Sequence, residues 1–262
     1  MISVLMYHQI STIPQELDPS GLAVPVHIFR KQMDYMHQKK FNCLSLMEAV
    51  RYWRKNSKPQ KRSFVLTFDD GYKDFYTTIA PILEHYKFTA TVFLVAEQVG
   101  KKTNWQGQNG ASAAQLMAWS EIKELASHGF SFGNHTLSHP RLTTLDIKDV
   151  KREIVDSKAI IEDKLGLPVD LFCYPYTANN SRIQQIVAES GHVASCGGNR
   201  GDWRLYNIWR SEYRRNDSFR SFVLKANGWH QRFVWLREQS IPGKILVPKM
   251  KSVRQKLHGN TI

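Results

Sequence analysis

The sequence lacks the features that tie a chain to disulfide frameworks or to membrane spans. It holds three cysteines in 262 residues, Cys43, Cys173 and Cys196, and no CxxC pair. An odd number at wide spacing cannot pair fully within one chain, so a reducing compartment is the simplest interpretation. No apolar run approaches the roughly 18 residues of a membrane-spanning helix. The first eight residues lack the basic and long apolar regions of a signal peptide, which favours a cytoplasmic location.

Acidic residues are in the minority. The 36 lysines and arginines outnumber the 23 aspartates and glutamates, giving a formal charge of +13. Such a balance attracts polyanions, although a solvated surface with no specific partner is the alternative interpretation. No zinc-finger, homeodomain or RNA-binding signature is present, so no nucleic-acid partner is expected. An anionic inner-membrane surface remains a possible partner for a peripheral protein.

Short apolar runs rich in β-forming residues alternate with helical patterns along the chain. Strands are predicted at residues 2–6, 64–68, 89–95, 130–132 and 171–174, with weaker candidates at 192–196 and 206–209. Helices are predicted at residues 27–39, 46–54, 77–86, 120–127, 147–164 and 181–189. The alternation favours parallel βαβ units, and therefore an α/β sheet or barrel.

The alternation ends near Gly228, which predicts one domain over residues 1–228 and a basic C-terminal extension over 229–262. Residues 244–258 mix lysines and an arginine with apolar residues, as in segments that bind membrane surfaces. Pro248 interrupts any helix there, so a frayed terminal extension is the alternative.

The strongest local motif is Thr-Phe-Asp-Asp-Gly at residues 67–71, directly after an apolar run. Parallel α/β folds build active sites at the carboxyl ends of strands. Because neighbouring side chains in an extended or turning chain point apart, Asp69 and Asp70 can do different work. One can bind a cation while the other transfers a proton. The alternative is an Asp-Asp-Gly turn with capping carboxylates.

A second motif, His-Thr-Leu-Ser-His, spans residues 135–139 after another predicted strand. Histidines four residues apart lie on one face of a helical turn, so His135 and His139 can bind one metal ion. Together with a carboxylate they form a set that leaves coordination positions open for water and substrate. Zinc is the first choice, and cobalt, nickel or iron also suit these ligands. Surface or capping histidines are the alternative.

Two weaker signals accompany these motifs. The segment Phe-Cys-Tyr-Pro-Tyr at residues 172–176 places Pro175 after a strand, where it fixes a turn. The backbone N–H of Tyr176 could then point into a pocket as an oxyanion donor, although such turns are common. His8 leaves the first predicted strand, and a single histidine of this kind is usually structural.

Taken together, TFDDG, HTLSH and FCYPY resemble the polysaccharide deacetylase family, the NodB-homology or carbohydrate esterase family 4 enzymes. The resemblance runs over roughly residues 1–225 and includes GYKDFYTTIAPIL, ATVFLV and WSEIKELASHGFSFGNHTLSHPRLT. The LMYH start is similar to the branch that contains poly-N-acetylglucosamine deacetylases. The resemblance implies a single-domain, distorted (β/α)7 barrel with its site at the strand carboxyl ends.

The resemblance also implies residue roles. Asp69 is expected to be the general base and Tyr176 to donate its backbone N–H to the oxyanion. The metal ligands are expected to be Asp70, His135 and His139. In the branch that this chain resembles, a histidine on the first strand supplies the acid, which makes His8 the candidate.

Some positions depart from the family pattern. Cys173 stands where many members carry an arginine that orients the base, and Thr177 stands where relatives often have glycine. The late Leu-x-His motif of other members is absent. Arg210 is the candidate that could orient Asp69 instead, and Trp209 with Pro175 is expected to line the acetate pocket.

The sequence therefore predicts a metal-dependent hydrolase of linear amide bonds that removes the N-acetyl group from an N-acetylhexosamine of a glycan. The expected cytoplasmic location favours a lipid-linked or lipopolysaccharide intermediate as the substrate. The alternative is a glycan-binding module that keeps the metal site without turnover, an interpretation that Cys173 supports.

Overall fold

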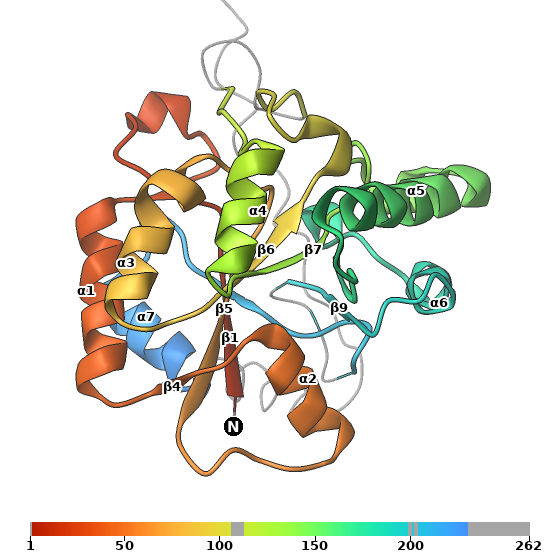
Figure 1. Ribbon diagram of the computed structural model, residues 1–262. Coiled ribbons are helices and arrows are strands. Elements are labelled where there is room, and N and C mark those ends of the chain that lie inside the picture. Colours follow the sequence, from red (N-terminus) through yellow and green to blue (C-terminus); the bar gives the residue numbers. More distant parts are fainter. Residues whose placement is uncertain (1, 106–112, 199–200, 202–203, 230–262) are drawn as a thin grey trace, which may run out of the picture.

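The computed structural model describes residues 2–105, 113–198, 201 and 204–229, which form one domain (Figure 1). Its main feature is an eight-stranded sheet with the order β10-β1-β5-β6-β7-β8-β9, in which β4 also pairs with β5. Every pairing in this sheet is parallel. The strands are β1 (Ile2–Tyr7), β4 (Asn42–Cys43), β5 (Ser63–Phe68), β6 (Thr91–Leu94), β7 (Ser131–Asn134), β8 (Leu171–Cys173), β9 (Ala194–Cys196) and β10 (Ser211–Glu212).

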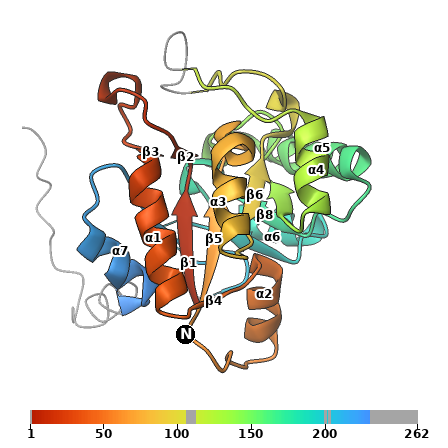
Figure 2. The same ribbon diagram turned by 60° about the vertical axis from the view of Figure 1, so that its left-hand side comes forward.

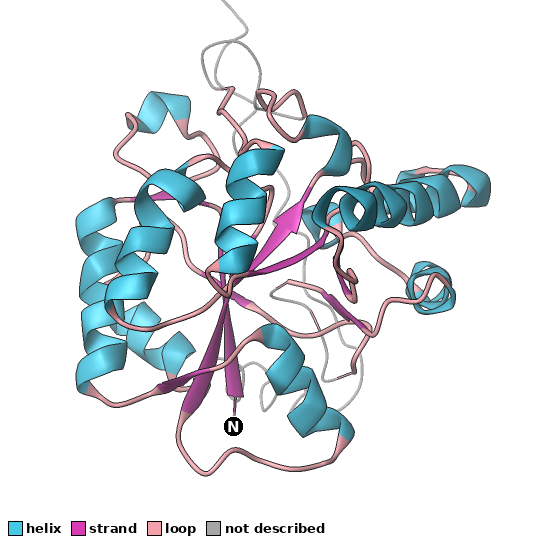
Figure 3. Cartoon of the chain, in the orientation of Figure 1, coloured by secondary structure: helices cyan, strands magenta, loops and turns pink. Residues whose placement is uncertain are grey.

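Helices surround this sheet, as the cyan ribbons around the magenta strands show in Figure 3. They are α1 (Val26–Gln38), α2 (Leu46–Arg54), α3 (Ala80–His85), α4 (Trp119–Ser127), α5 (Ile147–Leu165), α6 (Ser181–Glu189) and α7 (Phe219–Ala226). Short turns of helix are η1 (Gln15–Leu17), η2 (Phe75–Ile79), η3 (Ala96–Gln98), η5 (Leu142–Thr144) and η6 (Pro175–Thr177), and β2 (Gln9–Ile10) pairs with β3 (Ala23–Val24). This arrangement confirms the predicted α/β barrel type of fold.

Burial explains why the sequences of the central strands are nearly continuous apolar runs. All six residues of β1 and all six of β5 are buried, as expected for parallel strands covered on both faces. The two strands pair in register from Ile2 opposite Ser63 to Tyr7 opposite Phe68. Their carboxyl ends therefore meet at one edge of the sheet, and that edge carries the residues described below.

The first and last helices pack together, so the described part of the chain closes into one unit. Tyr35 of α1 makes edge-to-face contacts with Phe219 and Phe222 of α7, at ring-centroid distances of 5.8 and 6.0 Å. Figure 2 shows the two helices side by side. Such aromatic pairs stabilise a core beyond the area that they bury.

Local sequence explains several helix ends. Ser45 and Glu48 form a reciprocal capping box at the start of α2. Gly166 ends α5 with a φ of 67°, a left-handed conformation that glycine adopts without strain. Both ends lie within one residue of the predicted boundaries.

One predicted strand is wrong. Residues 206–209 form no strand, and only Ile208 makes an isolated bridge, to Cys196. The sheet instead takes its edge strand two residues later, at β10, where Leu5 and Met6 of β1 provide the partners. Pairing with β1 therefore decides where the edge strand lies. The local run of large side chains at residues 206–209 could not indicate that position.

None of the helices in the described ranges combines the length and the hydrophobicity that a membrane span requires. The predicted basic extension, including residues 244–258, lies outside the described residues beyond Trp229.

Candidate active site

Asp69 and Asp70 follow β5 at a sharp turn. The N–H of Asp69 still donates to the Tyr7 carbonyl at 3.0 Å, continuing the pairing with β1. Asp70 and Gly71 both have a φ of 75°, which turns the chain away from the strand direction. A Cβ at Gly71 would lie 2.9 Å from Leu94 Cδ2, so a larger residue would also displace the Leu94 side chain. The turn separates the directions of two carboxylates that are each only 4% exposed.

Asp70 lies with the two histidines of the second motif. Its Oδ1 is 3.3 Å from Nε2 of His135 and 3.3 Å from Nε2 of His139. Ligand atoms of the three residues all lie within 4.8 Å of one another, and all three residues are buried. The structure therefore brings together the three residues that the sequence predicted as metal ligands.

The loop geometry between the histidines differs from the prediction. His135 follows β7, but the segment to His139 is a loop and not a helical turn. Thr136 has a φ of 72° and His139 a φ of 66°, both in the left-handed region. Pro140 follows, and the residue before a proline is disfavoured in a right-handed helix. The rings still converge, with centroids 5.0 Å apart.

Hydrogen bonding shows that a cation fits between these side chains. His135 Nδ1 lies 2.8 Å from the Cys173 carbonyl oxygen, which can only accept, so Nδ1 carries the proton. In the neutral ring, Nε2 then presents a lone pair to Asp70 Oδ1, a buried oxygen with no hydrogen-bond partner in the described part of the chain. Two acceptors that face each other in the protein interior are stabilised by a shared metal ion.

His139 is held in the form that a metal requires. Burial lowers the pKa of this imidazole, and this effect outweighs the nearby Asp70 carboxylate, which acts in the opposite direction. A neutral ring offers Nε2 as a ligand at neutral pH.

The loop is anchored by a residue that sequence reasoning missed. Glu153, on the buried face of α5, accepts hydrogen bonds from the backbone N–H groups of Leu137 and Ser138 at 2.9 and 3.0 Å, and from Ser138 Oγ at 2.7 Å. The only signal in the sequence was an acidic residue in the stripe of α5 that also contains Val150 and Ile154. Glu153 thus fixes the two residues that precede His139.

Asp69 is paired with Arg210. The guanidinium donates from Nη1 to Oδ1 at 2.6 Å and from Nη2 to Oδ2 at 2.7 Å, and Arg210 is fully buried. Burial alone would raise the pKa of the Asp69 carboxyl, but the charge and hydrogen bonds of Arg210 hold it below its usual value. Asp69 is therefore an oriented, ionised carboxylate beside the metal-ligand set.

Arg210 also explains the unusual cysteine. Its Nη2 lies 3.0 Å from Cys173 Sγ, so the guanidinium occupies the space beside the position where the family pattern has arginine. Asp69, His135 and Cys173 also lie close enough to share an ion, but the guanidinium already supplies the positive charge there.

His8 lies at the same edge of the sheet. It follows Tyr7, whose pairing partner Phe68 precedes Asp69. Its Nδ1 is 3.9 Å from Oε1 of Glu212, a residue of β10 that the sequence analysis did not single out. A two-residue strand leaves almost no pattern that could have identified Glu212.

The remaining predicted residues flank this centre. Pro175 and Trp209 are buried, and the indole Nε1 of Trp209 has no hydrogen-bond partner among the described residues. Tyr176 adopts a left-handed φ of 56° after β8, and its ring centroid lies 4.8 Å from that of His139. The ring of Tyr176 thus lies beside His139, and the role of its backbone N–H as an oxyanion donor stays a prediction.

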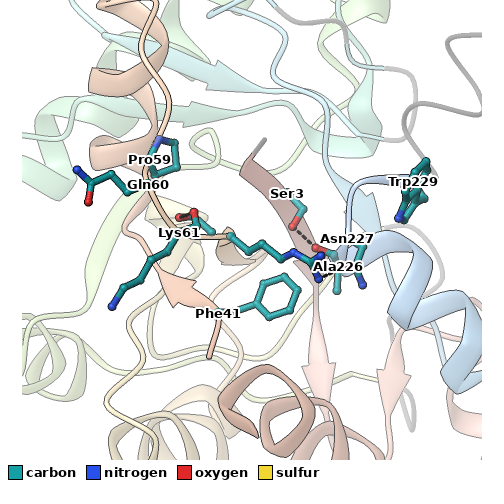
Figure 4. Close-up of a pocket in the computed structure, with 10 residues that line it drawn as sticks. Ser3, Phe41, Pro59, Gln60, Lys61, Ala226, Asn227 and Trp229 are labelled. Carbon is teal, nitrogen blue, oxygen red and sulfur yellow. Dashed lines mark hydrogen bonds between the residues drawn. The ribbon is translucent and has the colours of Figure 1, made fainter. Parts of the chain in front are cut away.

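A separate cavity of about 330 Å³ lies at the other end of the strands. Its lining includes Ser3 and Ser63, near the starts of β1 and β5, together with Phe41, Asn227 and Trp229 (Figure 4). No member of the Asp70, His135, His139 set lines it. This cavity is therefore distinct from the candidate active site.

The chain is similar to several known deacetylases. The deacetylase PplD of Streptococcus pyogenes, solved in complex with acetate, is 28% identical with a TM-score of 0.74, over 86% of this chain and 97% of PplD. A poly-β-1,6-N-acetyl-D-glucosamine N-deacetylase of Staphylococcus aureus is 22% identical over 214 residues, 78% of this chain and 72% of that protein. YxkH of Bacillus subtilis is 27% identical over 191 residues, 73% of this chain, and the match spans 62% of YxkH.

The sequence profile of the family described as polysaccharide deacetylase matches residues 56–195. This range includes both aspartates of the first motif, both histidines of the second, and Tyr176. It accounts for more than half of the 262 residues. The chain belongs to the polysaccharide deacetylase family.

Proposed function

We propose that the protein is a metal-dependent glycan N-deacetylase, a hydrolase that cleaves the acetamide of an N-acetylhexosamine. The observation that carries this proposal is that two neighbouring carboxylates on one turn have different partners. Asp69 is oriented by the buried Arg210, and Asp70 faces two imidazoles. One carboxylate is thus arranged for proton transfer and the other for holding a cation.

The metal ligands would be Asp70, His135 and His139. A divalent ion, with zinc as the first candidate, supplies Lewis-acid polarisation of the amide carbonyl and makes a nearby water more acidic. Asp69 accepts the proton of the attacking water, and Arg210 keeps its carboxylate ionised and fixed in direction.

Collapse of the tetrahedral species requires an oxyanion donor and an acid. The backbone N–H of Tyr176 stabilises the oxyanion, and His8 protonates the departing amine nitrogen. Oε1 of Glu212 lies 3.9 Å from His8 Nδ1. A C–O bond forms, the C–N bond breaks, and acetate and a free amino sugar leave.

The substrate class is an N-acetylated amino-sugar glycan. The name of the Staphylococcus aureus relative specifies poly-β-1,6-N-acetyl-D-glucosamine, and PplD was solved with acetate, the second product of such a reaction. Within this class we propose a lipid-linked or lipopolysaccharide intermediate, handled in the cytoplasm at the inner membrane. The formal charge of +13 supports attraction to such an anionic surface.

Acetate release from N-acetylglucosamine oligomers tests the function. Zinc-loaded protein should release acetate, and Asp69→Asn should lower kcat at least 100-fold because the base is lost. Undiminished release by Asp69→Asn would overturn the mechanism. Binding of the oligomers without any release by the wild type would favour the alternative, a glycan-binding module with a metal site.

A further inference from the structure

Four planar groups of the candidate active site form a row that runs from the buried Trp105 to the exposed Arg141. The ring of Trp105 lies 4.5 Å from that of His139, and the ring of His139 lies 4.8 Å from that of Tyr176. The guanidinium carbon of Arg141 then lies 4.7 Å from the centre of the Tyr176 ring. The second member of the row, His139, is thus a candidate metal ligand, and the last member is the guanidinium of Arg141.

Arg141 differs from the other charged groups of this region because no group in the described part of the chain neutralises it. Asp69 is paired with Arg210, and Glu212 is paired with Arg214 at 2.6 Å. In contrast, no hydrogen bond or ion pair joins the Arg141 guanidinium to any residue that the structure describes, and the side chain is exposed.

Stacking holds this guanidinium without using its donors. A cation over an aromatic face is attracted by the ring quadrupole, while the N–H groups at the guanidinium edge stay available. These donors form a planar fork that matches a phosphate or a carboxylate. Two spacings of less than 5 Å separate the fork from the ring of His139, a reach that one sugar unit and its substituent can span.

We propose that Arg141 is a specificity-determining residue that binds an anionic substituent, a phosphate or a carboxylate, of the glycan being deacetylated. This inference rests on the proposed deacetylase function and adds to it a substrate class. A neutral glycan would leave the guanidinium hydrated, so it would be turned over with lower efficiency. An anionic glycan would form charge-assisted hydrogen bonds with it.

The test compares kcat/KM for three N-acetylglucosamine oligosaccharides: neutral, carrying a phosphomonoester, and carrying a carboxylate as in N-acetylmuramic acid. Wild-type enzyme should prefer at least one anionic substrate, and Arg141→Gln should reduce that preference roughly tenfold, mainly through KM. Arg141→Lys keeps the charge but loses the planar fork, so it should recover only part of the preference. The preference of the wild type should also weaken as ionic strength rises.

Arg152→Gln is the matched control. Arg152 is an exposed arginine of α5, so its removal changes the net charge equally without touching the row. It should leave the substrate preference unchanged. An equal loss in Arg152→Gln and Arg141→Gln would show a general charge effect and overturn the assignment.

A binding measurement separates this inference from the proposed function. Calorimetry with the de-N-acetylated forms of the same saccharides requires no turnover. Tighter binding of an anionic form to wild type than to Arg141→Gln supports the assignment even if no acetate is released. Equal binding by both proteins overturns it, even where deacetylation of the neutral oligomer succeeds and the proposed function stands.

Discussion

The orientation of the candidate base depends on one buried ion pair. An isolated guanidinium or carboxylate in the protein interior is costly, but the bidentate geometry of Arg210 and Asp69 satisfies both charges. Arg210 also donates from Nε to the Gly197 carbonyl at 2.8 Å, which fixes the plane of the guanidinium. The direction of the Asp69 lone pairs is therefore set by residues that never need to contact the substrate.

Arg210→Lys should separate charge from geometry. Lysine keeps a cation near Asp69 but cannot form two parallel hydrogen bonds, so kcat should fall about 100-fold with a smaller change in KM. Steady-state acetate release checks this. Arg215→Lys is the control, because Arg215 pairs with Asp18 away from the metal-ligand set. A kcat equal to that of the control would show that Asp69 is positioned without the guanidinium fork.

At the scale of elements, much of the arrangement was readable from the sequence. The apolar runs before Asp69 and His135 predicted β5 and β7, and parallel pairing placed both carboxyl ends at one edge. The segment from His135 to His139 was expected to be a helical turn. Its loop conformation depends partly on distant partners, because Ala96 and Glu97 donate their N–H groups to its carbonyls. Glu153 was missed because nothing in the sequence of α5 indicates which N–H groups donate hydrogen bonds to its carboxylate.

The support of this loop by α5 gives a prediction. Glu153→Leu would leave the buried N–H of Leu137 without a partner, at a cost of about 1–3 kcal/mol, and would also remove the acceptor of the part-buried Ser138 N–H. The same change should weaken zinc binding roughly 10–100-fold, because the loop would no longer hold His139 in place. Glu153→Gln keeps an acceptor and should lose much less.

Competition with a chromophoric chelator measures the zinc affinity, and chemical denaturation measures the stability. Asp156→Asn, an exposed change on the same helix, is the control and should match the wild type in both. Zinc affinity of Glu153→Leu equal to that of Asp156→Asn would contradict a positioning role for Glu153.

At the scale of the whole molecule, a metal at the strand ends would join segments far apart in the chain. Asp70 follows β5, whereas His135 and His139 follow β7. Because a metal binds the folded site and not the unfolded chain, saturating zinc should stabilise the protein by about 3 kcal/mol at 100 times its Kd. The melting temperature should therefore fall by roughly 5–10 °C on chelation and recover on adding zinc. The Asp70→Asn variant should show no such response; a wild type equally insensitive to zinc would contradict the metal site.

A second property of the whole molecule is its stability in acid, where His192 is the informative group. His192 is 2% exposed, and its Nε2 lies 3.2 Å from Asn134 Nδ2 while its Nδ1 lies 2.9 Å from Ser190 Oγ. The amide nitrogen of Asn134 can only donate, so Nε2 accepts and the ring is neutral. Burial, assisted by the positive charge of Lys158, lowers the pKa of His192 to about 4.

The sign of the pH effect follows from this lowered pKa. Above pH 6.5 the ring is neutral in both the folded and the unfolded chain, so His192 adds no pH dependence there. Between pH 6.5 and 4 the unfolded chain takes up a proton that the folded chain does not bind, which lowers the free energy of unfolding by up to about 1.4 kcal/mol per pH unit and roughly 3 kcal/mol in all.

His192→Gln keeps an acceptor for Asn134 but cannot titrate. The difference in unfolding free energy between wild type and His192→Gln should therefore shrink steadily as pH falls from 7 to 4.5. A difference that stays constant over this pH range would show that the buried ring takes up its proton without opposing the fold.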